Sequence, residues 1–191
     1  MNSEDFLFNI ALYGPALFIV VATILSVLTP GYGMVKNTIS ELALGKLGRL
    51  QEVNFVVSGG LIVTLGILLV GRHAALYQSL GIIAMGSIMF LSAFFRTDPV
   101  DQSVTRTTTP RGAVHIALFM VGILAMMTAQ LGWSLHSFGS LFSLYSLLSG
   151  IVVLVCFAGV ANRPQQGGLF QRILLVDIMT WITMFALVNG R

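Results

Sequence analysis

One acidic residue, Asp177, lies inside an otherwise uncharged apolar run, and it is the first candidate for chemistry in this sequence. The run covers residues 173–190, which places Asp177 about one turn inside a membrane-spanning helix. A carboxylate at membrane depth costs about 3 kcal/mol unless it is paired or hydrated, so this side chain is expected to face other helices. Its expected partners are Arg96, Arg111 and His115. The same placement also fits a helix–helix salt bridge with no further role.

A second candidate is His115, which stands near the start of the fourth apolar run. A nearby carboxylate would make its imidazole a usable acid–base group. Without one, His115 is a hydrogen-bonded core residue. Asn54 and Ser58, four residues apart near the start of the second run, share one helix face and add polar groups there.

The segment after the first apolar run is predicted to form a short helix at the membrane interface. Thr38 and Glu41 have the spacing of a capping box, and Gly45 fits the glycine that ends many helices. Glu41 is therefore either a cap or a site carboxylate, and Ser40 stands beside it. The segment after the third run contains Arg96 and Asp98, which on structural grounds alone belong to a solvated loop.

Metal and cofactor chemistry have little support in the sequence. A catalytic zinc ion takes three protein ligands, commonly histidines, and the chain has three histidines at scattered positions. Carboxylates of Glu41, Asp98, Asp101 and Asp177 could instead hold a hard cation. Neither a pair of axial haem histidines, a phosphate-binding glycine loop nor a nucleophile elbow is found. Metal content, cofactor and catalytic activity stay open.

Membrane-spanning helices are the elements that must position these residues. Of the 191 residues, 56% are hydrophobic and 9% are charged, whereas soluble domains carry about 25% charged residues. The apolar runs are continuous rather than alternating, which predicts helices and not a barrel. We expect one all-α domain over residues 1–191, with six spans at about 7–29, 53–71, 75–95, 113–132, 140–161 and 173–189.

Basic residues are distributed unevenly between the two sides of this predicted bundle. Eight of the ten Lys and Arg residues fall in the first, third and fifth connections, and only Arg72 and Arg191 fall on the other side. The positive-inside rule then predicts that both termini lie outside a prokaryotic plasma membrane. The net charge of +3 follows from this asymmetry. No basic patch is interleaved with aromatic residues, so a nucleic-acid partner is not expected.

Several of these residues resemble the motifs of a known family. Pro30-Gly31-Tyr32, the run from Asn37 to Leu42, Gly45, Asn54 and Ser58-Gly59-Gly60 resemble a prokaryotic six-helix membrane family catalogued as domain of unknown function 998. In that family an "ISELG"-like segment follows the first helix, an Asn opens the second and a His opens the fourth. The family is distantly similar to membrane proteins related to the GPI-remodelling protein Frag and to the autophagy modulators, some of which act in lipid remodelling.

The resemblance implies that the polar residues converge on one cavity facing the cytoplasm. Substrate-binding roles would fall to Ser40, Asn54, Ser58, Arg96 and Asp98. Catalytic roles would fall to His115, Glu41 and Asp177, with Asp177 closing the cavity. Arg96 stands where the family commonly has a proline, so the match is looser there.

Three hypotheses about function follow. The first is binding or processing of a lipid or another amphiphile, with membrane lipids as partners. The second is a small-solute or proton-coupled transporter in which Asp177 titrates, although no internal repeat supports it. The third is a non-catalytic bundle that serves a partner. Substrate and oligomeric state stay open.

Overall fold

The computed structural model of the chain describes residues 3–99, 109–136 and 139–190. Asp101, which the sequence offered as a cation ligand, lies outside this part of the chain. The described residues form helices and connections without any strand, and the predicted all-α bundle is confirmed. The helices are α1 (Ser3–Ala11), α2 (Gly14–Leu28), η1 (Ile39–Leu44), α3 (Gly48–Gly71), α4 (Leu76–Ser92), α5 (Pro110–His136), α6 (Leu141–Asn162), η2 (Pro164–Gln166) and α7 (Gly167–Asn189).

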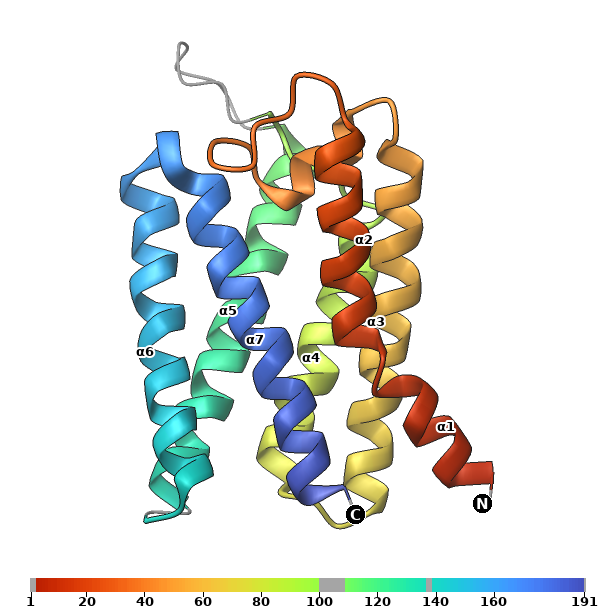
Figure 1. Cartoon of the computed structure of the whole chain (residues 1–191), viewed down its shortest axis with the longest axis vertical. Helices are drawn as coiled ribbons and strands as arrows, with labels where there is room; N and C mark the ends of the chain where they lie inside the picture. Colours follow the sequence, from red (N-terminus) through yellow and green to blue (C-terminus); the bar gives the residue numbers. More distant parts are fainter. Residues whose placement is uncertain (1–2, 100–108, 137–138, 191) are drawn as a thin grey trace.

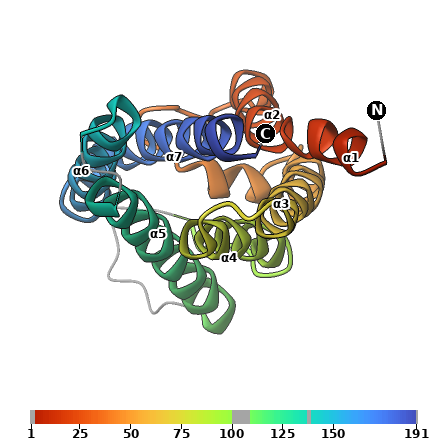
Figure 2. The same ribbon diagram turned by 90° about the horizontal axis from the view of Figure 1, so that it is seen from below.

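The helices from α2 to α7 form a ring in chain order. Each helix packs against the next, and α7 closes the ring by lying against α2 (Figure 2). Large side chains fill the interior, among them Phe18, Ile62, Leu174 and Trp181, all with no exposed surface. Helices α3 and α4 approach each other closely, since a Cβ atom added to Gly59 would lie 2.6 Å from the backbone nitrogen of Phe90.

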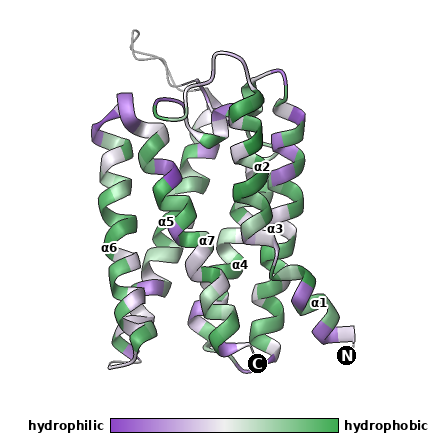
Figure 3. Cartoon of the chain, viewed as in Figure 1, coloured by the Kyte–Doolittle hydropathy of each residue, from purple (hydrophilic) through white to green (hydrophobic). Residues whose placement is uncertain are grey.

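In the described part of the chain five helical segments are long and apolar enough to cross a membrane, which makes this chain an integral membrane protein. They are Ser3–Leu28, Gly48–Gly71, Pro110–His136, Leu141–Asn162 and Pro164–Asn189. The remaining expected span corresponds to α4, an apolar helix of 17 residues. At 1.5 Å per residue it is about 26 Å long, slightly less than a hydrocarbon core of about 30 Å, so its crossing stays a prediction. Hydrophobic residues dominate the helix shafts and hydrophilic residues gather mainly toward their ends (Figure 3).

Helix boundaries differ from the expected spans at two places. The span expected at 7–29 consists of two helices, since the chain turns at Leu12 and Tyr13 before Pro15 opens α2. A proline ring fits the first turn of a helix but removes a backbone donor from a helix interior, so the break falls there. The last helix begins at Gly167, six residues before the expected start, and Arg172 is inside it.

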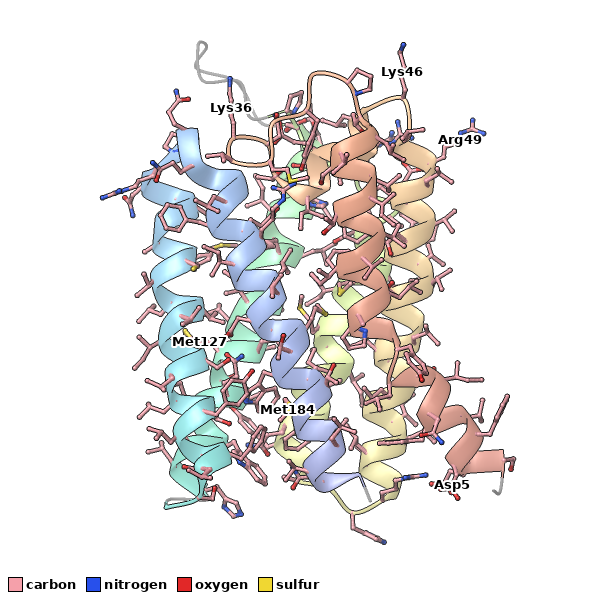
Figure 4. All side chains as sticks on the ribbon, in the orientation of Figure 1. Asp5, Lys36, Lys46, Arg49, Met127 and Met184 are labelled. Carbon is pink, nitrogen blue, oxygen red and sulfur yellow. The ribbon has the colours of Figure 1, made fainter. Side chains whose placement is uncertain are left out.

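The two ends of the bundle differ in charge. Segments 29–47, 93–99 and 163–166 lie at one end, and both chain termini lie at the other (Figure 1). Lys36, Lys46 and Arg49 lie at the first end, and Asp5 at the second (Figure 4). We call these the basic end and the termini end. At the termini end, the Arg72 guanidinium lies 2.7 Å from the Asp5 carboxylate and donates to the Gly190 carbonyl.

Candidate functional site

The segment between α2 and α3 is held against the first turns of α7. Arg172 donates hydrogen bonds to the carbonyls of Met34 (2.7 Å) and Asn37 (2.8 Å), and to the hydroxyls of Tyr32 (2.5 Å) and Ser26 (3.0 Å). A planar guanidinium with five N–H donors suits such a set of acceptors. Arg172 therefore does more than contribute to the charge asymmetry between the two ends, which is the only role that the sequence suggested for it.

The predicted short helix is present as η1, and its capping box is present as well. The Glu41 carboxylate accepts hydrogen bonds from the Thr38 backbone N–H at 2.7 Å and from the Thr38 hydroxyl at 3.1 Å. Ile39 and Leu42 are buried against α2, α3 and α7, so η1 forms part of the bundle interior at the basic end. Glu41 acts here as a cap, and its expected catalytic role stays a prediction.

Gln171 connects η1 to α7. Its Oε1 atom accepts a hydrogen bond from the Ile39 backbone N–H at 2.6 Å, and the side chain is buried. This contact holds the neighbouring Ser40 at the inner end of the segment, where its hydroxyl lies 3.4 Å from that of Thr38.

His115 lies one and a half turns into α5, facing the bundle. Its Nδ1 atom lies 2.8 Å from the carbonyl oxygen of Phe95, and the side chain is buried. A carbonyl only accepts, so Nδ1 carries the proton in this bond. No described carboxylate contacts the ring, and the acid–base pair expected from the sequence is not formed by these residues.

A cavity of about 500 Å³ brings these groups together at the basic end; we call it the outer cavity. Most of its apolar lining comes from α5 and α6, and most of its polar lining comes from residues 38–40, the segment after α4 and the first turns of α7. The lining consists of Thr38, Ser40, Thr97, Asp98, Pro99, His115, Ile116, Phe119, Met120, Phe157, Val160, Ala161 and Gln171.

A smaller hollow of about 40 Å³, which we call the inner pocket, continues toward the core. Ser40, His115, Phe119 and Gln171 line both spaces, so they stand at the junction between them. The other walls of the inner pocket are apolar side chains of α2, η1, α3, α4 and α7, together with Ser92. The arrangement offers a polar junction between an apolar hollow and a wider, partly polar space.

Asp98 lines the outer cavity, but its carboxylate is already engaged. Its two oxygens accept hydrogen bonds from the Thr109 backbone N–H at 2.9 Å and from the Thr109 hydroxyl at 2.8 Å. The Thr109 hydroxyl in turn accepts from the Gly112 N–H, as expected for a residue that caps α5. Asp98 thus fixes the start of α5 and closes the cavity on that side.

Three other expected site residues lie away from this cavity. Asn54 donates to the Phe18 carbonyl at 3.1 Å and accepts from Ser58 at 3.1 Å, so this pair ties α3 to α2. Arg96 is exposed and donates to Glu52 at 2.6 Å. Hydrogen bonding to Glu52, supported by its charge, raises the pKa of the Arg96 guanidinium above its ordinary value. Substrate contacts by these three residues stay a prediction.

Asp177 is deeper in the membrane than the expected helix start implied. It lies ten residues after Gly167, about 15 Å along α7. Its carboxylate accepts a hydrogen bond of 2.5 Å from the Ser149 hydroxyl, and Ser149 accepts one of 2.9 Å from Gln130. Asp177 lines neither the outer cavity nor the inner pocket, so the structure does not bring it together with His115.

Sequence reasoning missed Gln171 and the apolar wall around Phe119. Gln171 sits beside Arg172, and a pair of polar residues at the start of an apolar run could have drawn attention to both. Phe119 looks like any lipid-facing residue in the sequence. No group of three His, Cys, Asp or Glu side chains suited to a metal ion occurs in the described part of the chain.

Comparison with known proteins gives one match. The sequence profile of a family described as "Protein of unknown function (DUF998)" matches residues 12–188. No curated protein matches the chain, and no solved structure matches it either. The match therefore carries no activity, ligand or site residue with it.

Proposed function

We propose a function for this chain from its own cavity, because the chain belongs to the DUF998 family of membrane proteins and that membership assigns no activity. The protein binds a lipid or another amphiphile in the outer cavity at its basic end. By the positive-inside rule this end faces the cytoplasm, so the ligand comes from the inner leaflet.

The volume and the lining of the outer cavity are the main support for this proposal. Its volume of about 500 Å³ lies within the range of about 300–1,000 Å³ that is typical of small-molecule sites. One wall is built from Ile116, Phe119, Met120 and Phe157, which suit an acyl chain. Ser40, His115 and Gln171 lie together at the junction with the inner pocket, where they suit a head group.

Access from the bilayer supports the same function. Ile116 and Met120 line the cavity, and 50% and 40% of their surface is exposed. We take this exposed apolar wall of α5 to open toward the bilayer. An amphiphile that enters between α5 and α6 keeps its apolar part in an apolar environment throughout, which avoids the large penalty of crossing a polar barrier.

A substitution that fills the cavity tests this proposal. Val160→Trp places a large side chain in the cavity wall of α6, and Val155→Trp on the same helix, where Val155 is exposed to lipid, is its matched control. Native mass spectrometry of protein extracted in mild detergent should show lipid retained by the wild type and by Val155→Trp, with most of it lost from Val160→Trp. Equal retention by all three proteins, or by none, would contradict binding in this cavity.

The alternative of transport driven by Asp177 draws less support from the structure. Asp177 is separated from the outer cavity and is hydrogen-bonded to Ser149. The third hypothesis, a non-catalytic bundle that serves a partner, predicts no lipid in the cavity. The comparison of lipid retention between wild type and Val160→Trp therefore tests it as well.

A further inference from the structure

The polar groups of the outer cavity are almost all uncharged. In the described lining they are the hydroxyls of Thr38, Ser40 and Thr97, the His115 imidazole, the Gln171 amide and the Asp98 carboxylate. No lysine or arginine of the described chain belongs to this lining, although seven lie elsewhere at the basic end. Asp98, the one carboxylate, is engaged by Thr109. Within the described lining an anionic head group would therefore meet no lysine or arginine, and burial of an unpaired charge is strongly unfavourable.

His115 offers the cavity a hydrogen-bond acceptor. Because Nδ1 donates to the Phe95 carbonyl, the neutral ring carries its lone pair on Nε2. Nε2 forms no hydrogen bond to any residue that the structure describes, and His115 lines both the outer cavity and the inner pocket. The tautomer is thus fixed by the backbone, and the accepting nitrogen is available to a ligand.

Gln171 offers a hydrogen-bond donor at the same junction. Its Oε1 atom accepts from the Ile39 N–H, and this bond fixes the orientation of the amide because a backbone N–H only donates. The Nε2 atom, with two hydrogens, then has no acceptor among the described residues. The residue lines both the outer cavity and the inner pocket, so this donor is available to a ligand at their junction.

We infer that the amphiphile carries an uncharged hydroxyl head group, as a long-chain primary alcohol or a diacylglycerol does. This inference rests on the proposed function and names the class of ligand for the same site. A hydroxyl accepts one hydrogen bond from Gln171 Nε2 and donates one to His115 Nε2, with the Ser40 hydroxyl free to rotate as either partner. A carboxylate or phosphate monoester dianion has no hydrogen to give to His115.

Photoactivatable lipids that share one diazirine-bearing chain test the inference on the wild-type protein in nanodiscs. The head groups are a primary alcohol, a diacylglycerol, a carboxylate and a phosphate monoester, and labelled peptides are mapped by mass spectrometry. The alcohol or the diacylglycerol should label α5 and α6 around Ile116 and Val160 about tenfold more than the two anions do. The comparison between the two neutral probes shows which of them is the better ligand.

Two nearly isosteric substitutions test the two hydrogen bonds. Gln171→Glu keeps an oxygen to accept from Ile39 and replaces the donor by an acceptor. His115→Asn keeps a donor for the Phe95 carbonyl and removes the accepting Nε2. Each should lower labelling by the neutral probe about five- to tenfold, whereas Gln165→Glu, at an exposed position, should not change it.

The outcomes separate this inference from the proposed function. Labelling of the cavity by the carboxylate or phosphate probe as strong as by the neutral probes would overturn the hydroxyl head group and leave lipid binding in place. Full labelling of both Gln171→Glu and His115→Asn by the neutral probes would also overturn the hydroxyl head group and leave lipid binding in place. Cavity labelling by none of the probes would overturn lipid binding itself.

Discussion

Tyr32 is hydrogen-bonded to the segment that contributes Thr38 and Ser40 to the outer cavity. Its hydroxyl donates toward the carbonyls of Thr38 (2.7 Å) and Asn37 (3.0 Å), while it accepts from Arg172. Burial raises the pKa of the Tyr32 phenol above its ordinary value of 10.0, against the opposing effect of the nearby Arg172 guanidinium. The neutral phenol is the form that stabilises this segment.

Replacement of Tyr32 by phenylalanine should lower the free energy of unfolding by about 1 kcal/mol at neutral pH. Because the folded-state pKa is raised, the stabilising effect of the phenol is complete below pH 10.0 and is lost as the pH rises through the folded-state pKa. Thermal unfolding in detergent from pH 7 upward should therefore show a constant difference between wild type and Tyr32→Phe that shrinks only above this value. A difference that shrinks at lower pH would contradict the assignment.

At single positions, the sequence predicted local contacts better than distant ones. The Thr38–Glu41 capping box follows from spacing over three residues, and it is present. The contact between Gln171 and Ile39 joins residues 132 positions apart, and no pattern in either segment specifies it. The cavity depends on contacts of this second kind, so the residue pattern alone predicted a common side for Asn54, Ser58 and His115, and only the family resemblance implied that they converge.

At the level of elements, the outer cavity depends on how closely α7 approaches the segment before η1. The backbone N–H groups of Gly168 and Leu169 donate to the carbonyls of Lys36 and Val35 at 3.2 and 3.0 Å. A Cβ atom on Gly168 would collide with the carbonyl oxygens of Asn37 and Met34, whereas one on Gly167 would meet nothing within 4 Å. Two adjacent glycines thus have different structural roles.

This difference gives a matched pair of substitutions. Gly168→Ala should push the segment before η1 away from α7. We expect it to lower the free energy of unfolding by about 2 kcal/mol and to weaken retention of the ligand in the outer cavity. Gly167→Ala should be neutral or slightly stabilising, because alanine favours a helix over glycine. Melting temperatures and lipid retention of both variants provide the measurement. Equal effects of the two substitutions would show that the close approach is unimportant.

Element boundaries were harder to predict than element type. In the sequence Arg172 directly precedes the last apolar run, so the last helix was expected to begin at residue 173. In the structure Arg172 is inside α7, where its guanidinium donates hydrogen bonds to backbone carbonyls and to hydroxyls. The shift moves Asp177 deeper along the helix and separates it from the residues with which it was grouped.

For the whole molecule, charge and topology point the same way. The one basic residue described at the termini end, Arg72, is paired with Glu4 and Asp5, so this end carries no positive excess in the described residues. The basic residues at the other end are largely exposed and would have to be desolvated to cross a membrane. By the positive-inside rule this asymmetry predicts both termini outside the cytoplasm, and the orientation stays a prediction.

Reporter fusions in a bacterial host test this orientation. Alkaline phosphatase, which is active only after export, should be active when it is fused after Asn189 and inactive when it is fused after Lys46 or Asn162. Green fluorescent protein should show the opposite pattern at the same positions. An inactive phosphatase after Asn189 would mean an odd number of crossings or the opposite orientation, and α4 would be the first helix to re-examine.

The contacts of α7 also have a consequence for biosynthesis. Its first turns supply Gly168, Gln171 and Arg172 to a segment that the ribosome completed some 130 residues earlier. Domains are generally assembled from the N-terminus as the chain emerges. The backbone groups of Val35, Lys36 and Ile39 therefore lack their α7 partners until the final helix has been inserted. A polypeptide truncated before α7 would expose that unfinished segment at the membrane surface, where quality-control proteases could recognise it.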